Sequence, residues 1–185
     1  YIHGGYKASD VVDYRGFKVH DIAKQKPTVG RAVLIDVPRY KNVEVLPDSY
    51  KITVEDIKET LEMEKVDIEK GDVAIIRTGF MKAYWSKDSK RFTDRSAGIS
   101  LEAAKYLIEE KGVSVIGGDN VSVEAIPAHE LEVHAYSLVE KGVPLMENMN
   151  LEELHERKVY EFIIAVAPLR IVGATASMVN PLAFL

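Results

Sequence analysis

Residues 71–80 read GDVAIIRTGF, and this stretch decides the fold class. Gly71 and Asp72 are typical turn residues, and the short β-branched run after them is typical of a buried strand. The run ends at Gly79, a residue that tolerates sharp backbone turns. We therefore expect a buried strand that begins after a turn and ends at a glycine.

The segments on either side alternate between strand and helix patterns. RAVLIDVP (31–38) and VSVIGG (113–118) are two more short apolar runs. Between 31–38 and the opening stretch lies TVEDIKETLEMEK, where Thr53 and Asp56 form a capping-box pattern and apolar residues recur at helical spacing. Further helices are predicted over 101–111 (capped by Ser100 and stopped by Gly112), around 129–141 and over 151–158, and further strands over 143–146 and within 159–174. This alternation, without repeats or linkers, predicts a single α/β domain with a mixed sheet over residues 1–185.

One long polar stretch, KAYWSKDSKRFTDRSAG (82–98), carries no strand or helix pattern that we recognise. Loops of this length are uncommon in compact domains and are often functional. Its aromatic residues, Tyr84, Trp85 and Phe92, either line a pocket or tether the loop to the core. We predict a functional loop here.

The composition restricts the partners and the chemistry. The chain has 185 residues, a net charge of −5 at pH 7, no cysteine and five histidines. An acidic chain without a basic stripe is not expected to bind nucleic acid or an anionic membrane, and no apolar run approaches the roughly 20 residues that cross a bilayer. Any metal ion must be bound by His, Asp or Glu. The simplest interpretation is a cytoplasmic protein that acts on a small molecule.

Asp119 is a first candidate for chemistry. It follows Gly117 and Gly118 at the carboxyl end of the strand predicted over 113–118, where open α/β sheets present ligand groups. Asp119 and Asn120 are equally suited to a turn that caps the next segment. The residues alone leave both interpretations open.

His134 and Glu147 are the second candidate. His134 lies in the helix predicted around 129–141, and Glu147 directly follows the short strand predicted over 143–146. A carboxylate at that strand end can meet the preceding helix across the turn at Gly142. One histidine and one glutamate are half of a metal site, since zinc takes about four ligands and manganese more. Taken alone, the sequence favours a histidine hydrogen-bonded to a neighbour.

The other histidines give weaker signals. His3 precedes two glycines, a context that suits a ligand or a frayed terminus. His155 is surrounded by charged residues and is predicted to be solvated. His129 is expected at a helix start in a cap or surface role, and the context of His20 predicts nothing definite.

The order of these segments resembles the cyclase family of metal-dependent hydrolases, which includes bacterial kynurenine formamidases and isatin hydrolases. The resemblance runs from about Gly4 to the end of the chain. It is more specific for the family than for a substrate. The segments that carry it are GDVAIIRTGF, AGISLEAAKYLIEEKGVSVIGGDNVSVE, HAYSLVEKGVPLMENMNLEEL, APLRIVGATAS and NPLAFL.

The resemblance implies a swivelling β/β/α-type domain, with a central mixed, barrel-like β-sheet flanked by helices, in homodimers or homotetramers. It also implies a divalent metal, zinc or manganese, and hydrolysis of an amide C–N bond by a metal-activated water, as in an arylformamidase. His134 resembles the second-site metal histidine of the family and Glu147 its glutamate ligand. Asp119 falls in the family's aspartate block, which implies a second-shell or substrate-region role.

The chain departs from the family pattern in three places. The signature HxGTHxDxPxH is absent, and its usual place is just before an HGG-like segment, whereas this chain starts with YIHGG. We therefore expect an N-terminally truncated cyclase-like domain whose main metal ligands precede Tyr1, with His3 as a candidate for the last, catalytic histidine of the motif. The spacing from His134 to Glu147 is one residue longer than expected, and GATASMVNP (173–181) replaces a Gly-Ser-Pro-x-Arg-Pro run.

Two functions remain open from the sequence. The first is a metal-dependent amidohydrolase of the arylformamidase kind. The second is a catalytically silent family member that binds a small ligand or a partner in the same cleft, which the missing motif favours.

Overall fold

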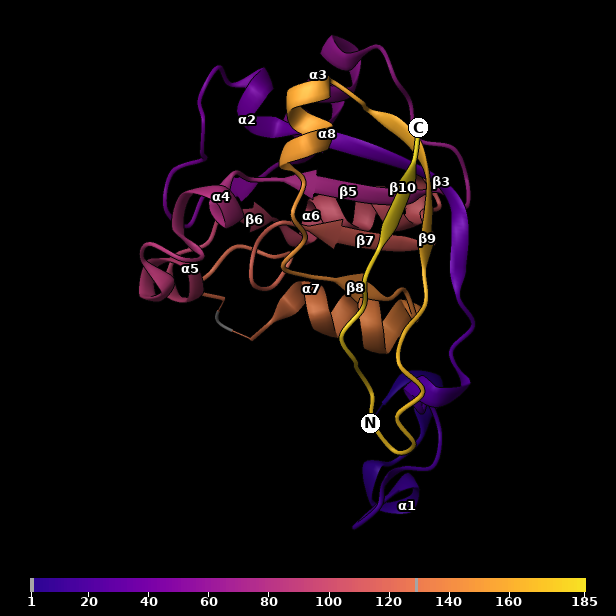
Figure 1. The fold of residues 1–185 in the computed structure, drawn as a ribbon. Coiled ribbons are helices and arrows are strands. Elements are labelled where there is room, and N and C mark those ends of the chain that lie inside the picture. The colour runs from indigo at the N-terminus through magenta and orange to yellow at the C-terminus, as the bar shows by residue number, and fades with distance from the viewer. Residues whose placement is uncertain (1, 129) are drawn as a thin grey trace.

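The computed structural model describes residues 2–128 and 130–185, and its centre is an open six-stranded mixed sheet. The sheet runs in the order β10-β9-β3-β5-β7-β8 (Figure 1), in which β3, β5, β7 and β8 are parallel and β9 and β10 are antiparallel. The strands are β3 (Thr28–Asp36), β5 (Val73–Arg77), β7 (Val115–Gly118), β8 (Leu145–Met146), β9 (Glu161–Val166) and β10 (Leu182–Phe184). The predicted α/β class with a mixed central sheet is confirmed, but this sheet does not close into a barrel.

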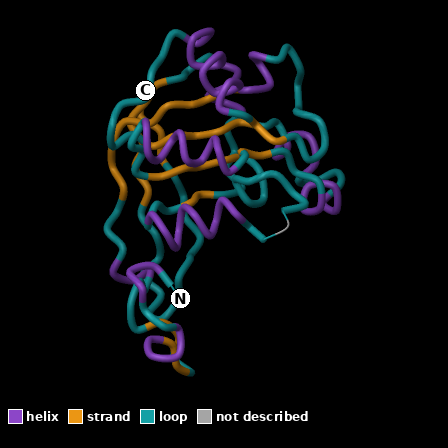
Figure 2. Tube along the Cα trace, turned by 180° about the vertical axis from the view of Figure 1, so that it is seen from behind, coloured by secondary structure: helices purple, strands orange, loops and turns teal. Residues whose placement is uncertain are grey.

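The helices alternate with the parallel strands. Figure 2 shows two helical rods across one face of the sheet, α6 continuing into η3 and α7 continuing into η4. The bounds are α2 (Val37–Tyr40), α3 (Val54–Glu64), α4 (Phe80–Tyr84), α5 (Ser89–Asp94), α6 (Leu101–Lys105), the π-helix η3 (Tyr106–Glu110), α7 (Glu132–His134), the π-helix η4 (Ala135–Lys141) and α8 (Glu152–Arg157). No helix of the described residues is both long and apolar enough to cross a membrane.

Smaller elements flank this body. A hairpin of β1 (Val12–Asp13) and β2 (Gly16–Phe17) lies near the N-terminus, and β4 (Lys51–Ile52) pairs in parallel with β6 (Gly98–Ile99). The N-terminal region also contains η1 (His3–Gly5), α1 (Ala8–Val11) and η2 (Ile22–Lys24).

The alternation of side chains along β3 produces two apolar cores. Val33 and Ile35 point into a large core shared with α3, α6 and η3, whereas Ala32 and Leu34 point into a smaller core on the opposite face. The smaller core is closed by apolar residues of β9 and of the segment around α8, among them Leu151. Burial on both faces explains the unbroken apolar runs of the parallel strands.

The predicted helix signals are confirmed at their starts. Thr53 and Asp56 form both hydrogen bonds of a capping box at α3, and Ser100 caps α6 by accepting from Ala103 N. Gly112 and Gly142 end the two helical rods with positive φ angles of 69° and 68°.

The prediction of a loop without regular structure over 82–98 is wrong. α4 extends to Tyr84, α5 occupies Ser89–Asp94, and β6 begins at Gly98. Asp88 starts α5 by accepting a hydrogen bond from Arg91 N, and the only strongly buried residue of this short helix is Phe92, which packs edge-on against Trp85. A six-residue helix with one buried side chain leaves almost no periodic signal. The alternative that the aromatic residues tether this stretch to the core is confirmed for Phe92.

Candidate functional site

His134 lies in the first turn of α7, and a glutamate fixes that turn. The Glu124 carboxylate accepts from the backbone N–H groups of Val133 (3.4 Å) and His134 (3.2 Å). These donors have no partner within the helix, so an acid from outside the helix fulfils the role of an N-cap. Negative charge at this end also interacts favourably with the helix dipole.

The imidazole of His134 lies between two carboxylates. Its Nδ1 is 2.5 Å from Glu124 Oε1 and its Nε2 is 3.1 Å from Glu147 Oε1. The side chain of Glu124 is 5% exposed, that of His134 24% and that of Glu147 33%, so the group passes from the interior to the surface. The hydrogen bonds to Glu124 and then to Glu147 raise the pKa of His134 to about 9 against the opposing effect of burial.

Backbone pairing places Glu147 opposite the histidine. Gly142 ends η4, and the chain returns along β7 as β8, so Glu147 directly follows the carboxyl end of a parallel strand. Asn148 N then donates to Asn120 O (3.0 Å). The predicted geometry, in which the carboxylate of Glu147 at a strand end meets His134 on the preceding helix, is therefore confirmed.

Asn120 connects the two sides of this group. Its side-chain Nδ2 donates to Ala97 O (2.7 Å) and to Glu124 O (3.2 Å), while its backbone carbonyl receives the bond from Asn148 N. Ser122 Oγ also donates to Glu124 O (2.8 Å). The loop after β7 therefore orients Glu124 and anchors the chain beside Glu147.

Sequence reasoning missed Glu124. The signal that could have found it is its place in GGDNVSVE, an acid six residues beyond the carboxyl end of a buried strand. What made Glu124 look ordinary is that its partner, His134, is ten residues away along the chain.

Asp119 lies at the end of β7, where it was predicted, and its carboxylate is directed into the protein. It accepts hydrogen bonds from Thr78 N (2.7 Å), Thr78 Oγ1 (2.6 Å) and Gly79 N (2.8 Å), and it is completely buried. Burial raises the pKa of Asp119 to about 6, against the hydrogen bonds from Thr78 and Gly79. Asp119 thus holds the turn between β5 and α4. Gly79 has a φ of 84° at this turn, and a Cβ there would lie 2.5 Å from Glu44 O.

His3 lies at the opposite end of the helical rod from His134. Its Nδ1 is 2.9 Å from Val139 O, and its ring rests on Gly142, where a Cβ would lie 2.7 Å from the imidazole. The backbone carbonyl of His3 in turn receives His20 Nε2 at 2.9 Å. The structure does not join His3 to the pair of His134 and Glu147.

His155 is not solvated, so that prediction is wrong. Its side chain is 18% exposed, and its Nδ1 lies 2.5 Å from Oδ2 of the buried Asp36. Asp36 also pairs with Arg77 at 3.0 Å, and a charged residue at the carboxyl end of β3 thereby draws the histidine inward. His129 lies outside the described residues.

The pair of His134 and Glu147 fits a metal ion as two adjacent donors. Ligating histidines commonly donate their second ring nitrogen to a carboxylate, as Nδ1 does toward Glu124. Nε2 must lose its proton to become a ligand. In residues 2–128 and 130–185, no group of three or more His, Cys, Asp or Glu side chains is arranged to hold a metal ion. The described residues therefore supply part of a coordination shell.

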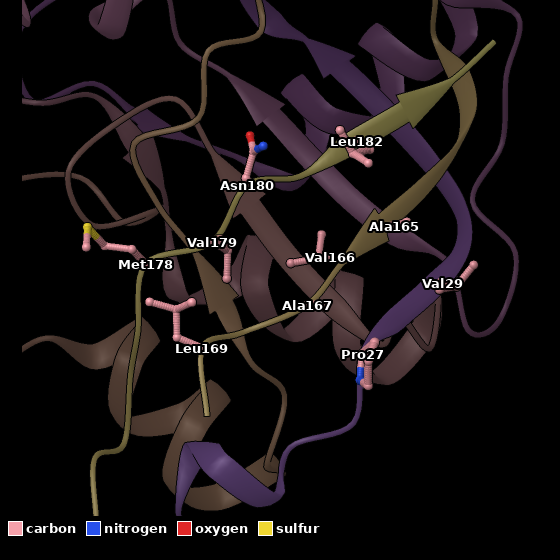
Figure 3. A pocket seen from close by; sticks show the side chains of 10 residues that line it. All are labelled: Pro27, Val29, Ala165, Val166, Ala167, Leu169, Met178, Val179, Asn180 and Leu182. Carbon is pink, nitrogen blue, oxygen red and sulfur yellow. The ribbon is translucent and has the colours of Figure 1, made fainter. Parts of the chain in front are cut away.

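Two cavities flank the C-terminal strand. One, of about 450 Å³, borders Glu147 and is lined by residues of the 147–157 segment, β9 and β10. The other, of about 420 Å³, is an aliphatic groove between the start of β3, the end of β9 and the segment that leads to β10 (Figure 3). Figure 3 shows Val166, Val179 and Leu182 pointing into this groove. Only the first cavity adjoins a titratable group of the candidate site.

The open mixed sheet brings a histidine and two carboxylates together near the carboxyl ends of β7 and β8, and this defines an α/β protein with a polar candidate site at that edge of the sheet. The family model described as "Putative cyclase" matches residues 8–125. The chain belongs to this Cyclase family, as the sequence resemblance predicted. No curated protein shows a significant match to the chain.

Solved structures share the fold. A crystal structure of a novel cyclase is 30% identical, with a TM-score of 0.86 over 98% of this chain and 61% of that one. Isatin hydrolase A from Ralstonia solanacearum is 23% identical, with a TM-score of 0.70 over 92% of this chain and 65% of that one. A potential metal-dependent hydrolase with cyclase activity is 22% identical, with a TM-score of 0.56 over 84% of this chain and 64% of that one. The chain thus spans less than two thirds of the length of each.

Proposed function

We propose that this protein is a metal-dependent hydrolase that cleaves a C–N amide bond, in the manner of an arylformamidase. The observation that carries the proposal is the 3.1 Å separation of His134 Nε2 and Glu147 Oε1, with Nδ1 of the same ring held by Glu124. Membership of the Cyclase family and the hydrolase names of related folds support it.

In this proposal His134 and Glu147 are two ligands of a zinc or manganese ion. A bound divalent ion supplies a water that is nucleophilic near neutral pH and a Lewis acid for the carbonyl of the substrate. The donors that complete the shell come from outside the described residues. Histidine and carboxylate ligands suit both metals, so the choice between them rests on experiment.

The remaining residues of the site have supporting tasks in this proposal. Glu124 orients the imidazole, Asn120 anchors the backbone on both sides, and the cavity beside Glu147 receives a small-molecule substrate. The same cavity is walled by apolar residues such as Phe162 and Ile164. Apolar walls exclude water and strengthen polar interactions within a site.

The test uses the purified protein. We expect zinc or manganese in the purified protein and hydrolysis of N-formyl aryl amides or of isatin. Glu147→Gln should lower both metal content and kcat/KM by tenfold or more, whereas His20→Gln, a matched change at an exposed histidine, should change neither. Unchanged metal content and activity in Glu147→Gln would refute the proposal.

A second candidate function is ligand binding without catalysis. The observation that favours it is the set of only two adjacent donors within the described residues. In that case isatin-like amides would raise the melting temperature of the protein without being turned over, with or without added metal.

We also propose that the protein forms homodimers or homotetramers. Large apolar side chains are exposed on the antiparallel side of the sheet, among them Val29, Ile163, Leu182 and Phe184. Contiguous apolar surface of this kind is typical of interfaces.

A further inference from the structure

A third cavity, separate from the candidate site, lies between the N-terminal hairpin and the C-terminal segment. It measures about 570 Å³ and is lined by β1, β2, the region of η2, and residues 170–173. Figures 1 and 2 both show this part of the chain projecting from the body. In Figure 1 the orange-yellow segment before β10 lies against the indigo N-terminal region. It shares no lining residue with the cavity beside Glu147.

Backbone contacts hold the two walls of this cleft together. Phe17 N donates to Gly173 O (2.9 Å), and Ile22 N donates to Ala174 O (2.7 Å). Gly16 and Gly173 both have positive φ, and a Cβ on Gly16 would lie 2.2 Å from Gly173 O. Only glycine fits at positions 16 and 173, so the sequence itself specifies the close contact that shapes the cleft.

The cleft is positively charged in an otherwise acidic protein. Four cationic side chains line it, against the carboxylates of Asp13 and Asp21. The cationic residues are Arg15, Lys18, Lys24 and Arg170. Focusing of the field by a concave surface makes such a cleft attractive to anions.

The two carboxylates are already engaged. Asp13 lies 3.3 Å from Arg15 Nη2 and 3.5 Å from Lys18 Nζ. Asp21 is 5% exposed and accepts from Ala23 N (2.7 Å). Backbone hydrogen bonds from Gly173 and Ala23 lower the pKa of Asp21, so it stays ionised and turned toward the backbone.

The hydrogen bonds of the other two cations go only to backbone carbonyls, although the charge of Lys24 also acts on Asp21. Lys24 Nζ lies 3.4 Å from Lys18 O, and Arg170 Nε donates to Ala23 O at 2.9 Å. Neither forms a salt bridge with any residue in the described part of the chain. The η nitrogens of Arg170 remain available, and a guanidinium fork suits phosphate or carboxylate groups.

We infer that this cleft binds a small organic anion that carries two or more negative charges on phosphate or carboxylate groups. Lys24 and Arg170 supply positive charge that no salt bridge in the described part of the chain holds, and Arg15 and Lys18 contribute from the hairpin. Phe17 and Val172 form an apolar wall for the carbon skeleton. The inference is independent of the hydrolase proposal, because it uses none of the residues around His134.

The test is calorimetric titration of the 185-residue chain with pyrophosphate and, separately, with citrate at low ionic strength. We expect saturable binding of at least one of them at a single site, weakened about tenfold or more in the Lys24→Gln/Arg170→Gln double variant. The matched control, Lys87→Gln/Lys90→Gln, removes the same charge from two exposed lysines elsewhere and should bind as the parent does. Binding of pyrophosphate alone assigns the site to phosphate groups, and binding of citrate assigns it to carboxylates as well.

Two results would overturn the inference. One is that no binding to the parent chain is measured at anion concentrations up to roughly 10 mM, where even weak specific binding is detected. The other is an equal loss of affinity in the control variant, which would show that binding depends only on the total charge of the protein. Arg170→Lys keeps the positive charge in case the double variant does not fold. It should weaken binding by about threefold or more, because it removes the fork geometry, but less than the double variant does.

Discussion

At the scale of single residues, Glu124 links helix formation to the orientation of His134. Its carboxylate accepts two backbone N–H groups of α7 and one ring nitrogen. We expect Glu124→Ala to destabilise the protein by about 1–2 kcal/mol, the cost of a lost N-cap. Glu124→Gln retains an oxygen acceptor and should lose less. Urea unfolding measures both.

The control for this prediction is Glu132→Ala. Glu132 is exposed and lies in the same first turn, so its loss should change stability by less than about 0.5 kcal/mol. An equal effect of both alanine variants would show that Glu124 acts only through general charge near the helix end. Loss of the hydrogen-bonded Nδ1 proton signal of His134 in Glu124→Ala, seen by NMR, separates ring orientation from capping.

Glu64 is a second residue whose environment has a measurable consequence. It is 8% exposed, Oε1 accepts from Asp36 N at 3.1 Å, and Oε2 has no hydrogen-bond partner among the described residues. Burial raises the pKa of Glu64 to about 8, with the nearby charge of Asp36 adding to the effect. The folded protein therefore holds a proton on Glu64 at pH 7.

The sign of the pH dependence follows. Between about pH 4.5 and pH 8 the unfolded chain releases this proton and the folded chain keeps it, so stability falls as the pH rises through that window. The total effect is on the order of a few kcal/mol, since each unit of pKa shift corresponds to about 1.4 kcal/mol. Glu64→Gln, which imitates the protonated form, should flatten the decrease, whereas Glu62→Gln on the exposed side of α3 should not. Denaturation curves of the parent, Glu64→Gln and Glu62→Gln at pH 5 and pH 8 give the change in the free energy of unfolding between the two pH values. An equal change in all three proteins would contradict the prediction.

At the scale of elements, α8 is held on the sheet by charge. None of its residues is fully buried, yet Glu152 meets Arg77 with two hydrogen bonds, at 3.0 and 3.2 Å. Arg77 is 0% exposed and is paired on its other side with Asp36. Burial alone would raise the pKa of Asp36, but the hydrogen bond from His155 and the charge of Arg77 together outweigh it and lower that pKa.

We expect Glu152→Ala to cost about 3 kcal/mol, because it leaves a buried guanidinium with one partner instead of two. Glu153→Ala, one residue further along the same helix, removes only an exposed pair with Arg157 and should cost less than about 0.5 kcal/mol. Thermal unfolding gives the two values. Faster hydrogen exchange confined to α8 in Glu152→Ala would show that the helix detaches locally. Equal costs for the two variants would show that the contact of Glu152 with Arg77 does not hold α8 on the sheet.

The elements that the sequence predicted well are those with strong local signals. β3, β5 and β7 are short β-branched runs, and α3 begins at a capping box that the structure reproduces. α4 and α5 were missed because each is five or six residues long and buries a single side chain. The π-helical ends of both rods carry no signal that distinguishes them from α-helix.

The candidate site divides in the same way. The turn at Gly142 indicated that His134 and Glu147 could meet, but the residues alone favoured a histidine hydrogen-bonded to a neighbour, and only the family resemblance implied that the two are metal ligands. The role of Glu124 depends on its contact with His134, ten residues further along the chain, and the buried position of His155 depends on its contact with Asp36, 119 residues away. Spacing and periodicity do not encode such contacts, which form only when the sheet is assembled.

At the scale of the whole molecule, the antiparallel end of the sheet, formed by β10, β9 and the start of β3, leaves large apolar side chains exposed. Phe184 is paired with Ile163 across β10 and β9, and these side chains are 56% and 46% exposed. The next row joins Leu182, Ala165 and Val29, with Leu182 53% and Val29 69% exposed. β10 also forms an edge of the sheet, with unpaired backbone groups that another strand can use.

These features favour self-association through this edge. Two antiparallel copies of an edge strand are related by a two-fold axis, so pairing of β10 with β10 would produce a closed dimer and bury Phe184 and Leu182 from both chains.

We expect the parent chain to sediment as a dimer or a higher closed oligomer in analytical ultracentrifugation. Leu182→Glu/Phe184→Glu should shift it to the monomer, because like charges on both copies would face each other in a desolvated interface. Val43→Glu/Met63→Glu changes the same number of exposed apolar residues elsewhere and should leave the oligomer intact. A monomeric parent chain, or an oligomer that survives the double change in β10, would show that this edge is not the interface.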